Sequence, residues 1–341
     1  MLPAVVVPTE ILVVRLSSIS GVLLATPLLR ALRRRHPEAR LTVLTEERHV
    51  PLLKHNPNVD QVAGVGPTAS LWAWARGLRQ HDFSYLLDLE GDTRSRSLRL
   101  LVRGRWRRPA RRRLAEYLLI HTKRNLLREA QSMAERYFAA ARELDVVPDG
   151  EPVDFCLANG ADNEAATWLD QVGLGSDRPL VAFAPGGSTA TRRWPAQAWV
   201  ELITRVTDTG ADAVLVGGSA DASLATDIAT QGGARAASSA GLLSLQGTGA
   251  ILKRAEAVIT GDTGALHMAT GVGTPVVALF GPTVREFGRF PYRAHATVVE
   301  RDLPCRPCSR RGGHTCPLQH HDCLRSIEPQ HVFNVLARTL S

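Results

Sequence analysis

"ILVVRLSSISGVLLATPLLRALRRRHP", residues 11–37, joins a short apolar run to a serine- and glycine-bearing turn and then to a long amphipathic stretch. The spacing predicts a buried strand over 11–15 and a helix over 22–35. Many α/β folds use such a strand–turn–helix segment to present backbone N–H groups to a ligand. The turn itself, Ser17–Gly21, contains no carboxylate, histidine or cysteine, so its chemistry has to be sought elsewhere.

The same alternation continues along the chain. Further apolar runs predict strands at 41–44, 84–89, 180–184, 213–216, 257–260 and 276–280, each separated by a helical pattern. Short buried strands that alternate with helices predict parallel sheets with crossover helices. Two successive series predict an α/β protein with two Rossmann-like domains that bind ligands in the cleft between them. We expect a first domain at 1–160, a second at 161–326, and a helix in 327–341 that packs back on the first.

The composition indicates an ordinary globular protein. The chain has 341 residues, of which 44% are hydrophobic and 22% charged, a balance that supports a substantial core. Five cysteines in this length do not indicate a disulfide scaffold. Residues 1–14 lack the basic start of a signal peptide, and no apolar window is long enough to span a membrane. We therefore expect a cytoplasmic protein.

Basic residues concentrate in one stretch, and they account for most of the formal charge of +8. They are Arg94, Arg96, Arg99, Arg103, Arg105, Arg107, Arg108, Arg111, Arg112, Arg113, Lys123, Arg124 and Arg128. Such a field attracts anions: a phosphorylated substrate, an anionic membrane surface or nucleic acid. The alternative is a solvated, arginine-rich helix face.

The segment "PGGSTATRRWP", residues 185–195, follows a predicted strand. Its glycines, among them Gly187, allow the backbone to approach a ligand closely. Ser188 and Thr189 supply hydroxyl groups, and Arg192 supplies charged donors that suit phosphate oxygens. The segment is either a grip for a pyrophosphate or a flexible loop with solvated arginines.

The segment "TGDTGALHMATGVGTPVVALFGPT", residues 260–283, is more specific. Its strand delivers Asp262, Thr263 and Gly264 to a helix N-terminus, where N–H groups and the helix dipole favour a phosphate. Asp262 would cap the helix, accept a hydrogen bond from a sugar hydroxyl, or do both. His267 lies on the first turns of that helix, where a lone histidine is more often structural than functional.

Four cysteines, Cys305, Cys308, Cys316 and Cys323, follow the spacing C-x2-C-x7-C-x6-C. Four thiolates can hold a structural zinc ion or an iron–sulfur cluster. The first pair has a suitable spacing, whereas the longer gaps are unusual for a zinc ribbon. A redox disulfide or simple reduced thiols remain alternatives.

Together these segments resemble the ADP-heptose:lipopolysaccharide heptosyltransferases, glycosyltransferase family 9. The resemblance also includes "VPLLKHNPNVDQV", "YLLDLEGDTRSRSL" and the late "CRPC" segment, in order over nearly the whole chain. It implies a GT-B fold and an inverting transfer of heptose, or a related sugar, from an ADP-sugar to the lipopolysaccharide core or a similar anionic glycan. It implies that the transfer needs no cofactor, that nucleic acid is no partner, and that the protein contacts the cytoplasmic face of the inner membrane peripherally.

The resemblance also assigns residues by position. Gly187, Ser188, Thr189, Arg192, Asp262, Thr263, Gly264 and His267 match the donor-binding segments, with Arg192 where the family usually has a lysine that contacts the donor phosphate. We expect the acceptor at Ser17, Ser18, Ser20, Arg94 and Arg96.

One departure falls on the opening turn. The family turn typically reads "SS-x-GD-V", with its Asp as the proposed base, whereas this chain has Ser20 and Gly21 at those places. A positioned base contributes roughly 10²–10⁴-fold to the rate, and glycine cannot act as one. Asp88, Glu90 and Asp92, at the end of another first-domain strand, are the candidates to replace it.

Other interpretations stay open. The acceptor could react without a base, or the protein could be a noncatalytic, nucleotide-sugar-binding or regulatory protein on the same fold. A dinucleotide oxidoreductase is disfavoured because the first turn lacks GxGxxG, and because no acidic residue follows directly on the predicted strand that ends at Leu44.

Overall fold

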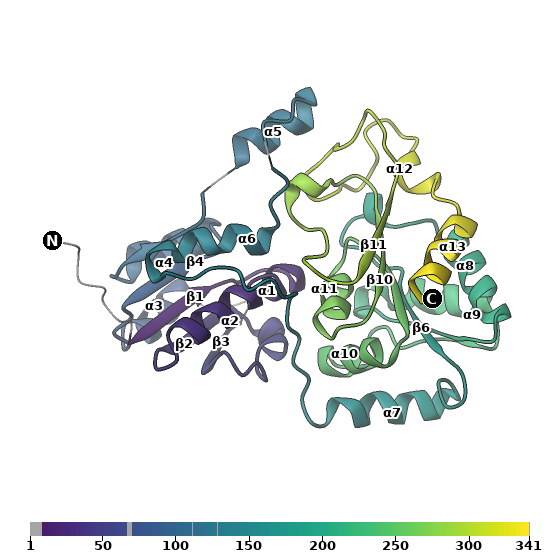
Figure 1. Cartoon of the computed structure of the whole chain (residues 1–341), viewed down its shortest axis with the longest axis horizontal. Coiled ribbons are helices and arrows are strands. Elements are labelled where there is room, and N and C mark those ends of the chain that lie inside the picture. The colour runs from purple at the N-terminus through teal and green to yellow at the C-terminus, as the bar shows by residue number, and fades with distance from the viewer. Residues whose placement is uncertain (1–8, 67–69, 111, 128, 341) are drawn as a thin grey trace. The chain divides into compact units, whose positions relative to one another are not determined.

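The computed structural model describes residues 9–66, 70–110, 112–127 and 129–340. Contacts divide the chain into two compact units (Figure 1). The first comprises Met1–Arg111 and Met133–Cys156, and the second Arg112–Ser132 and Leu157–Ser341. The basic stretch is thus divided between the two units, and its members Arg111 and Arg128 lie outside the described residues.

The first unit is built on a parallel sheet with the strand order β3-β2-β1-β4-β5. Its strands are β1 (Glu10–Val14), β2 (Arg40–Glu46), β3 (Gln61–Val65), β4 (Tyr85–Asp88) and β5 (Trp106–Arg107). Its helices are α1 (Ile19–Leu23), α2 (Thr26–Arg35), α3 (Leu71–Leu78), α4 (Thr93–Leu101) and α6 (Met133–Phe138), with 3-10 turns at Glu47–Leu52 and Ala139–Leu144. The central strand β1 is apolar and almost entirely buried, which the opening segment predicts.

Two details of this unit differ from the sequence analysis. The helix expected over 22–35 is divided into α1 and α2, because Ser18 caps a short first helix and Pro27 lies in the first turn of the second. Strand β2 runs past Leu44 to Glu46, so an acidic residue does end it. That part of the argument against a dinucleotide site was wrong, although the missing GxGxxG still stands.

The second unit is built on a six-stranded parallel sheet with the order β11-β10-β9-β6-β7-β8. Its strands are β6 (Leu180–Ala184), β7 (Asp212–Leu215), β8 (Ala236–Ser238), β9 (Ala257–Gly261), β10 (Val276–Phe280) and β11 (Ala296–Glu300). Its helices are α5 (Arg113–Thr122), α7 (Ala161–Val172), α8 (Ala196–Asp208), α9 (Ala222–Gly232), α10 (Leu245–Arg254), α11 (Gly264–Gly271), α12 (Asp322–Arg325) and α13 (Pro329–Leu340). Three 3-10 turns, Ala190–Arg192, Ser219–Asp221 and Arg285–Phe287, complete it. The α/β class with two parallel sheets is as predicted.

The C-terminal helix α13 packs in the second unit, contrary to the expectation that it would pack on the first domain. Its residues Val332, Val335 and Leu336 belong to the same core as Trp199 of α8, and Figure 1 shows α13 beside α8. The chain reaches this position directly because Leu324 and Ile327, just before α13, are already buried in that core.

Among the described residues, none of the helices combines the length and the apolar character that crossing a bilayer requires.

Candidate functional site

In the second unit, an ion pair joins the two predicted donor-binding segments. Arg192 Nη2 lies 2.7 Å from Asp262 Oδ1, and the two side chains are only 9% and 3% exposed. Asp262 directly follows β9, and the loop that carries Arg192 follows β6, the strand beside β9. Because parallel neighbours end at the same edge of a sheet, residues 70 positions apart in the chain meet there.

Asp262 has a second buried partner and is not the helix cap. Thr283 Oγ1 donates a hydrogen bond to Asp262 Oδ2 at 3.1 Å. The N-cap of α11 is Thr263, whose hydroxyl lies 2.9 Å from that of Thr260 and does not cap the first turn. Capping therefore does not explain Asp262. Its carboxylate instead holds the Arg192 guanidinium at the end of the sheet.

The loop between β6 and α8 shapes the other wall of this site. Arg192 Nη1 donates a hydrogen bond to Ser188 Oγ at 3.0 Å. Two of the residues predicted to bind the donor are therefore in direct contact. A Cβ added to Gly186 would lie 2.4 Å from Asp221 Cγ, which explains the glycine. Gly187 accepts a hydrogen bond from Arg193 Nε through its carbonyl at 3.0 Å.

His267, in α11, is fully buried. Burial lowers the pKa of its imidazole to about 4, and the positive charges of Arg289 and Arg192 contribute in the same direction. The ring is therefore neutral near pH 7. Arg289 is a site residue that the sequence analysis missed because no motif surrounds it. Burial and the charge of Arg192 lower the pKa of its guanidinium to about 10, against the opposing effect of Asp262.

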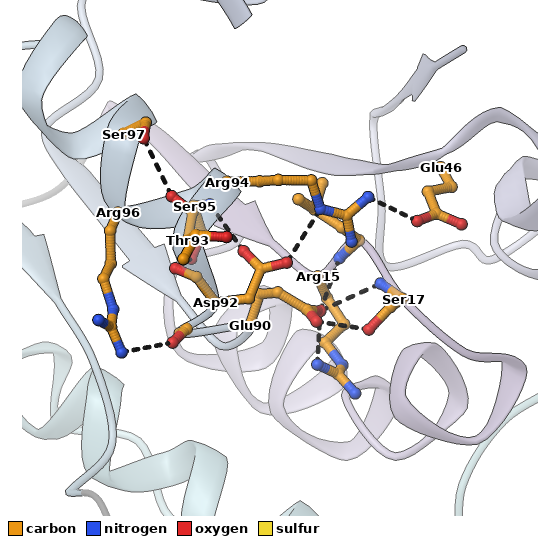
Figure 2. Close-up of polar contacts among 12 residues, drawn as sticks. Arg15, Ser17, Glu46, Glu90, Asp92, Thr93, Arg94, Ser95, Arg96 and Ser97 are labelled. Carbon is orange, nitrogen blue, oxygen red and sulfur yellow. Dashed lines mark hydrogen bonds and ion pairs between the residues drawn. The ribbon is translucent and has the colours of Figure 1, made fainter. Parts of the chain in front are cut away.

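In the first unit, Glu90 lies at the centre of a network on the opening turn (Figure 2). Its Oε2 accepts hydrogen bonds from Arg15 Nη1 at 2.5 Å, from the Leu16 amide at 3.1 Å and from the Ser17 amide at 3.0 Å. Its Oε1 accepts a hydrogen bond from the Ser17 hydroxyl. The Arg15 and Glu90 side chains are 9% and 6% exposed, so this carboxylate is held rigidly on the turn.

Arg15 also occupies the space beside Gly21. A Cβ built on Gly21 would lie 1.8 Å from Arg15 Nη2 and 2.4 Å from Arg15 Cζ. The same guanidinium lies 5.8 Å from the centroid of the Tyr137 ring. The guanidinium that pairs with Glu90 therefore also fills the space that a side chain at position 21 would need.

The other two candidate bases have structural partners. Asp88 is 1% exposed, and its Oδ1 accepts a hydrogen bond from the Gly91 amide at 2.8 Å. Asp92 is the N-cap of α4, accepting from the Ser95 amide at 2.9 Å, and it pairs with Arg94. Burial alone would raise the pKa of Asp92, but the Ser95 amide and Arg94 together outweigh it and lower the pKa below its ordinary value. Of the three, Glu90 is the carboxylate that contacts the predicted acceptor turn.

Comparison with known proteins identifies the family of the chain. The model of glycosyltransferase family 9 (heptosyltransferase) matches residues 71–319, well over half of the chain. The chain belongs to glycosyltransferase family 9. It is 27% identical to lipopolysaccharide heptosyltransferase 2 of Escherichia coli K12, over 96% of this chain and 97% of that protein.

Two solved structures share the fold of this family 9 chain. One is E. coli ADP-heptose lps heptosyltransferase II, with a TM-score of 0.75 and 22% identity over 97% of this chain and 98% of that chain. The other is E. coli heptosyltransferase WaaC with ADP, with a TM-score of 0.72 and 20% identity over 97% and 99%. The predicted family, the fold and the glycosyltransferase class are thereby confirmed.

In this family 9 enzyme the cysteine-rich segment contacts the loop between β6 and α8, which carries Arg192. The Gly313 carbonyl accepts a hydrogen bond from the Thr191 amide at 3.1 Å, and the Gly313 amide donates to Thr191 Oγ1 at 2.8 Å. Gly312 has a φ of +79°, and a Cβ there would lie 2.2 Å from Thr189 Oγ1. His321 Nε2 lies 2.8 Å from the Thr191 carbonyl oxygen. The segment therefore positions the residues that flank Arg192.

The structure gives no support for a metal site at the described cysteines. Among the described residues, no group of three or more His, Cys, Asp or Glu side chains could hold a metal ion, and all the cysteines are free thiols. Cys323 is buried in the sheet core, whereas Cys305, Cys308 and Cys316 are half-buried. Burial, followed by the neighbouring thiols, raises its pKa to about 11.

The basic stretch contributes ion pairs as well as positive charge. Arg94 lies 2.8 Å from Glu46 Oε1 and 2.9 Å from Asp92 Oδ2, so its charge is balanced within the first unit. Arg96 Nη2 contacts the Gly91 carbonyl oxygen at 3.4 Å. Ser18 caps α1 and is exposed, and Ser20 is half-buried in the same turn. The structure brings Ser17 and Ser18 together on the turn that Glu90 holds.

Proposed function

We propose that the protein transfers heptose, or a closely related sugar, from an ADP-sugar to the inner core of lipopolysaccharide, with inversion at the anomeric carbon. The observation that carries this proposal is the buried Arg192–Asp262 pair beside the N-terminus of α11. Family membership and the printed activities of the relatives support the choice of donor and acceptor.

The second unit binds the donor in this account. Arg192 and the amides near Gly187 and Gly264 meet the diphosphate, since guanidinium groups and helix N-termini both favour phosphate oxygens. Asp262 orients Arg192 and accepts a hydrogen bond from a donor hydroxyl. As the bond from the anomeric carbon to the diphosphate breaks, the leaving oxygen gains negative charge, and the nearby positive charge stabilises it.

Glu90 takes the role of the missing base. The acceptor hydroxyl loses its proton to the Ser17 hydroxyl oxygen while Ser17 passes its own proton to Glu90 Oε1. The acceptor oxygen forms the new bond to the anomeric carbon, and ADP leaves with the former bonding pair. The contact between Ser17 and Glu90 supports this relay, and so does the exclusion of any side chain at position 21 by Arg15.

We further propose that the enzyme works at the cytoplasmic face of the inner membrane, which it contacts peripherally. The acceptor is the anionic glycan of a membrane-anchored lipid, and basic residues near a membrane surface are attracted to anionic headgroups. Ser18, Ser20, Arg94 and Arg96 line the acceptor side.

Release of ADP from ADP-heptose, in the presence of a core glycolipid that lacks the heptose, tests the proposal. Release that requires both substrates is the expected result. Tight ADP-heptose binding without any release would favour the alternative, a noncatalytic or regulatory nucleotide-sugar-binding protein. Binding of UDP-, GDP- or CDP-sugars in preference to ADP-sugars would contradict the donor assignment.

A further inference from the structure

A shallow hollow of about 530 Å³ lies on the first unit, between α4 and the edge strand β5. Four arginines line it. Arg96 and Arg99 belong to α4, Arg107 belongs to β5, and Arg108 directly follows β5. Leu100, Gly104 and Trp106 complete the lining. Neither the donor site nor the Glu90 network uses Arg99, Arg107 or Arg108.

The charge of this hollow is positive and incompletely balanced. Arg107 pairs with both carboxylate oxygens of Glu143, through Nε at 2.7 Å and Nη2 at 2.8 Å. The Nε groups of Arg96 and Arg99 are buried and make no hydrogen bond to the residues that the structure describes. Buried N–H donors without an acceptor cost free energy, and an anion in the hollow would supply acceptors.

The apolar side chains of the hollow indicate which kind of anion it fits. Leu100 is 87% exposed although it lies among arginines. Trp106 donates its Nε1 to the Val102 carbonyl at 2.8 Å, which leaves its ring as an apolar wall. Outside the hollow, Trp72 on α3, a helix that contacts α4, is 65% exposed. Basic groups mixed with exposed Leu and Trp are typical of surfaces at a membrane–water interface.

We propose that this hollow binds the phosphate groups of an anionic lipid surface, with Leu100 entering the boundary between headgroups and acyl chains. The inference rests on the peripheral membrane contact of the proposed function and assigns residues to it. A nucleic acid fits less well, because the most exposed apolar side chain in the hollow is aliphatic and cannot stack on a base.

Vesicle sedimentation tests the site with the full-length protein. Wild type should bind vesicles of phosphatidylcholine mixed with phosphatidylglycerol, and bind pure phosphatidylcholine weakly. Each basic residue near an anionic surface contributes about fivefold in affinity. Arg99→Gln/Arg108→Gln should therefore bind the mixed vesicles roughly 20- to 30-fold more weakly, and Leu100→Ser should also weaken binding.

The matched control is Arg34→Gln/Lys54→Gln, which removes two exposed charges elsewhere on the first unit. It should stay within about twofold of wild type, because charges beyond a Debye length are screened. Equal losses in the control, or unchanged binding by Arg99→Gln/Arg108→Gln, would overturn the proposal. So would full competition by millimolar inorganic phosphate, which would identify a free-phosphate site, or tighter binding of a DNA duplex through the same arginines.

ADP release with a water-soluble acceptor, without vesicles, separates this inference from the proposed function. Arg99→Gln/Arg108→Gln should match wild type in that assay. If wild type itself released no ADP, the proposed function would fail while the vesicle result still decided the membrane site.

Discussion

The guanidinium of Arg15 lies where a side chain at position 21 would begin, with Arg15 Nη2 only 1.8 Å from the Cβ that Gly21 lacks. Glu90 holds that guanidinium through an ion pair of 2.5 Å. Position 21 thus carries no side chain, and Glu90, just after β4, supplies a carboxylate to the same turn. Any side chain at position 21 therefore requires the Arg15 guanidinium to move.

Gly21→Ala should destabilise the protein by roughly 1–3 kcal/mol, the usual cost of overpacking a filled site. Urea unfolding monitored by circular dichroism measures the free energy of unfolding. Gly77→Ala in α3 is the matched control, because a Cβ there would meet no atom within 4 Å. It should be neutral or stabilise the helix by up to about 1 kcal/mol. Equal effects at both positions would mean that Arg15 moves aside without cost.

Gly21→Asp should not increase the rate of ADP release, since the new carboxylate would compete with Glu90 for Arg15. The double variant Gly21→Asp/Glu90→Gln removes that competition and leaves Arg15 free to pair with the introduced carboxylate. It should be more active than either single variant. Additive effects of the two substitutions would show that positions 21 and 90 are independent.

Arg192→Lys should keep ADP affinity within about tenfold of wild type, because the charge that faces the diphosphate is retained. Arg192→Gln should lose about 10- to 100-fold, the usual effect of one or two charge-assisted hydrogen bonds. Isothermal titration calorimetry measures both. Arg205→Gln, which breaks an exposed pair with Glu201 on α8, should bind ADP like wild type. If Arg192→Gln did so too, Arg192 would not face the donor.

His267 should make stability depend on pH. Its folded-state pKa of about 4 lies below the ordinary value of 6.5, so the unfolded chain binds more protons between these values. The contribution is fully present above pH 6.5 and falls by about 3 kcal/mol as the pH drops to 4. His267→Gln should lack this part of the pH dependence when urea unfolding is measured from pH 7 to 4. Parallel curves for the two proteins would contradict the assignment.

Local patterns predicted most of the fold because buried strands are short, apolar and separated by amphipathic helices. Strands β6 and β10 lie at the predicted residues. The edge strands β3, β5, β8 and β11 were missed: β3, β8 and β11 are largely half-exposed and lack a continuous apolar run, and β5 has only two residues. The packing of α13 depends on tertiary contacts that no local pattern encodes.

The residues proposed to bind the donor could be singled out in the sequence because strand ends, glycines and a helix N-terminus carry a local signal. The pairing of Arg192 with Asp262 was not, since it depends on which strands are neighbours in the sheet. Arg289 and Gly312 carried no motif. The role of Arg15 was hidden for another reason: a side chain that fills the place of a missing one can be recognised only in three dimensions.

The most direct test of the account is single-turnover ADP release by Glu90→Gln with ADP-heptose and a heptose-free core glycolipid. The substitution keeps the size of the side chain and removes the proton acceptor. We expect the rate to fall by about 10²- to 10⁴-fold, with ADP affinity unchanged, because the proposed donor site lies in the other unit. A Glu90→Gln enzyme that releases ADP as fast as wild type would show that Glu90 is not the base.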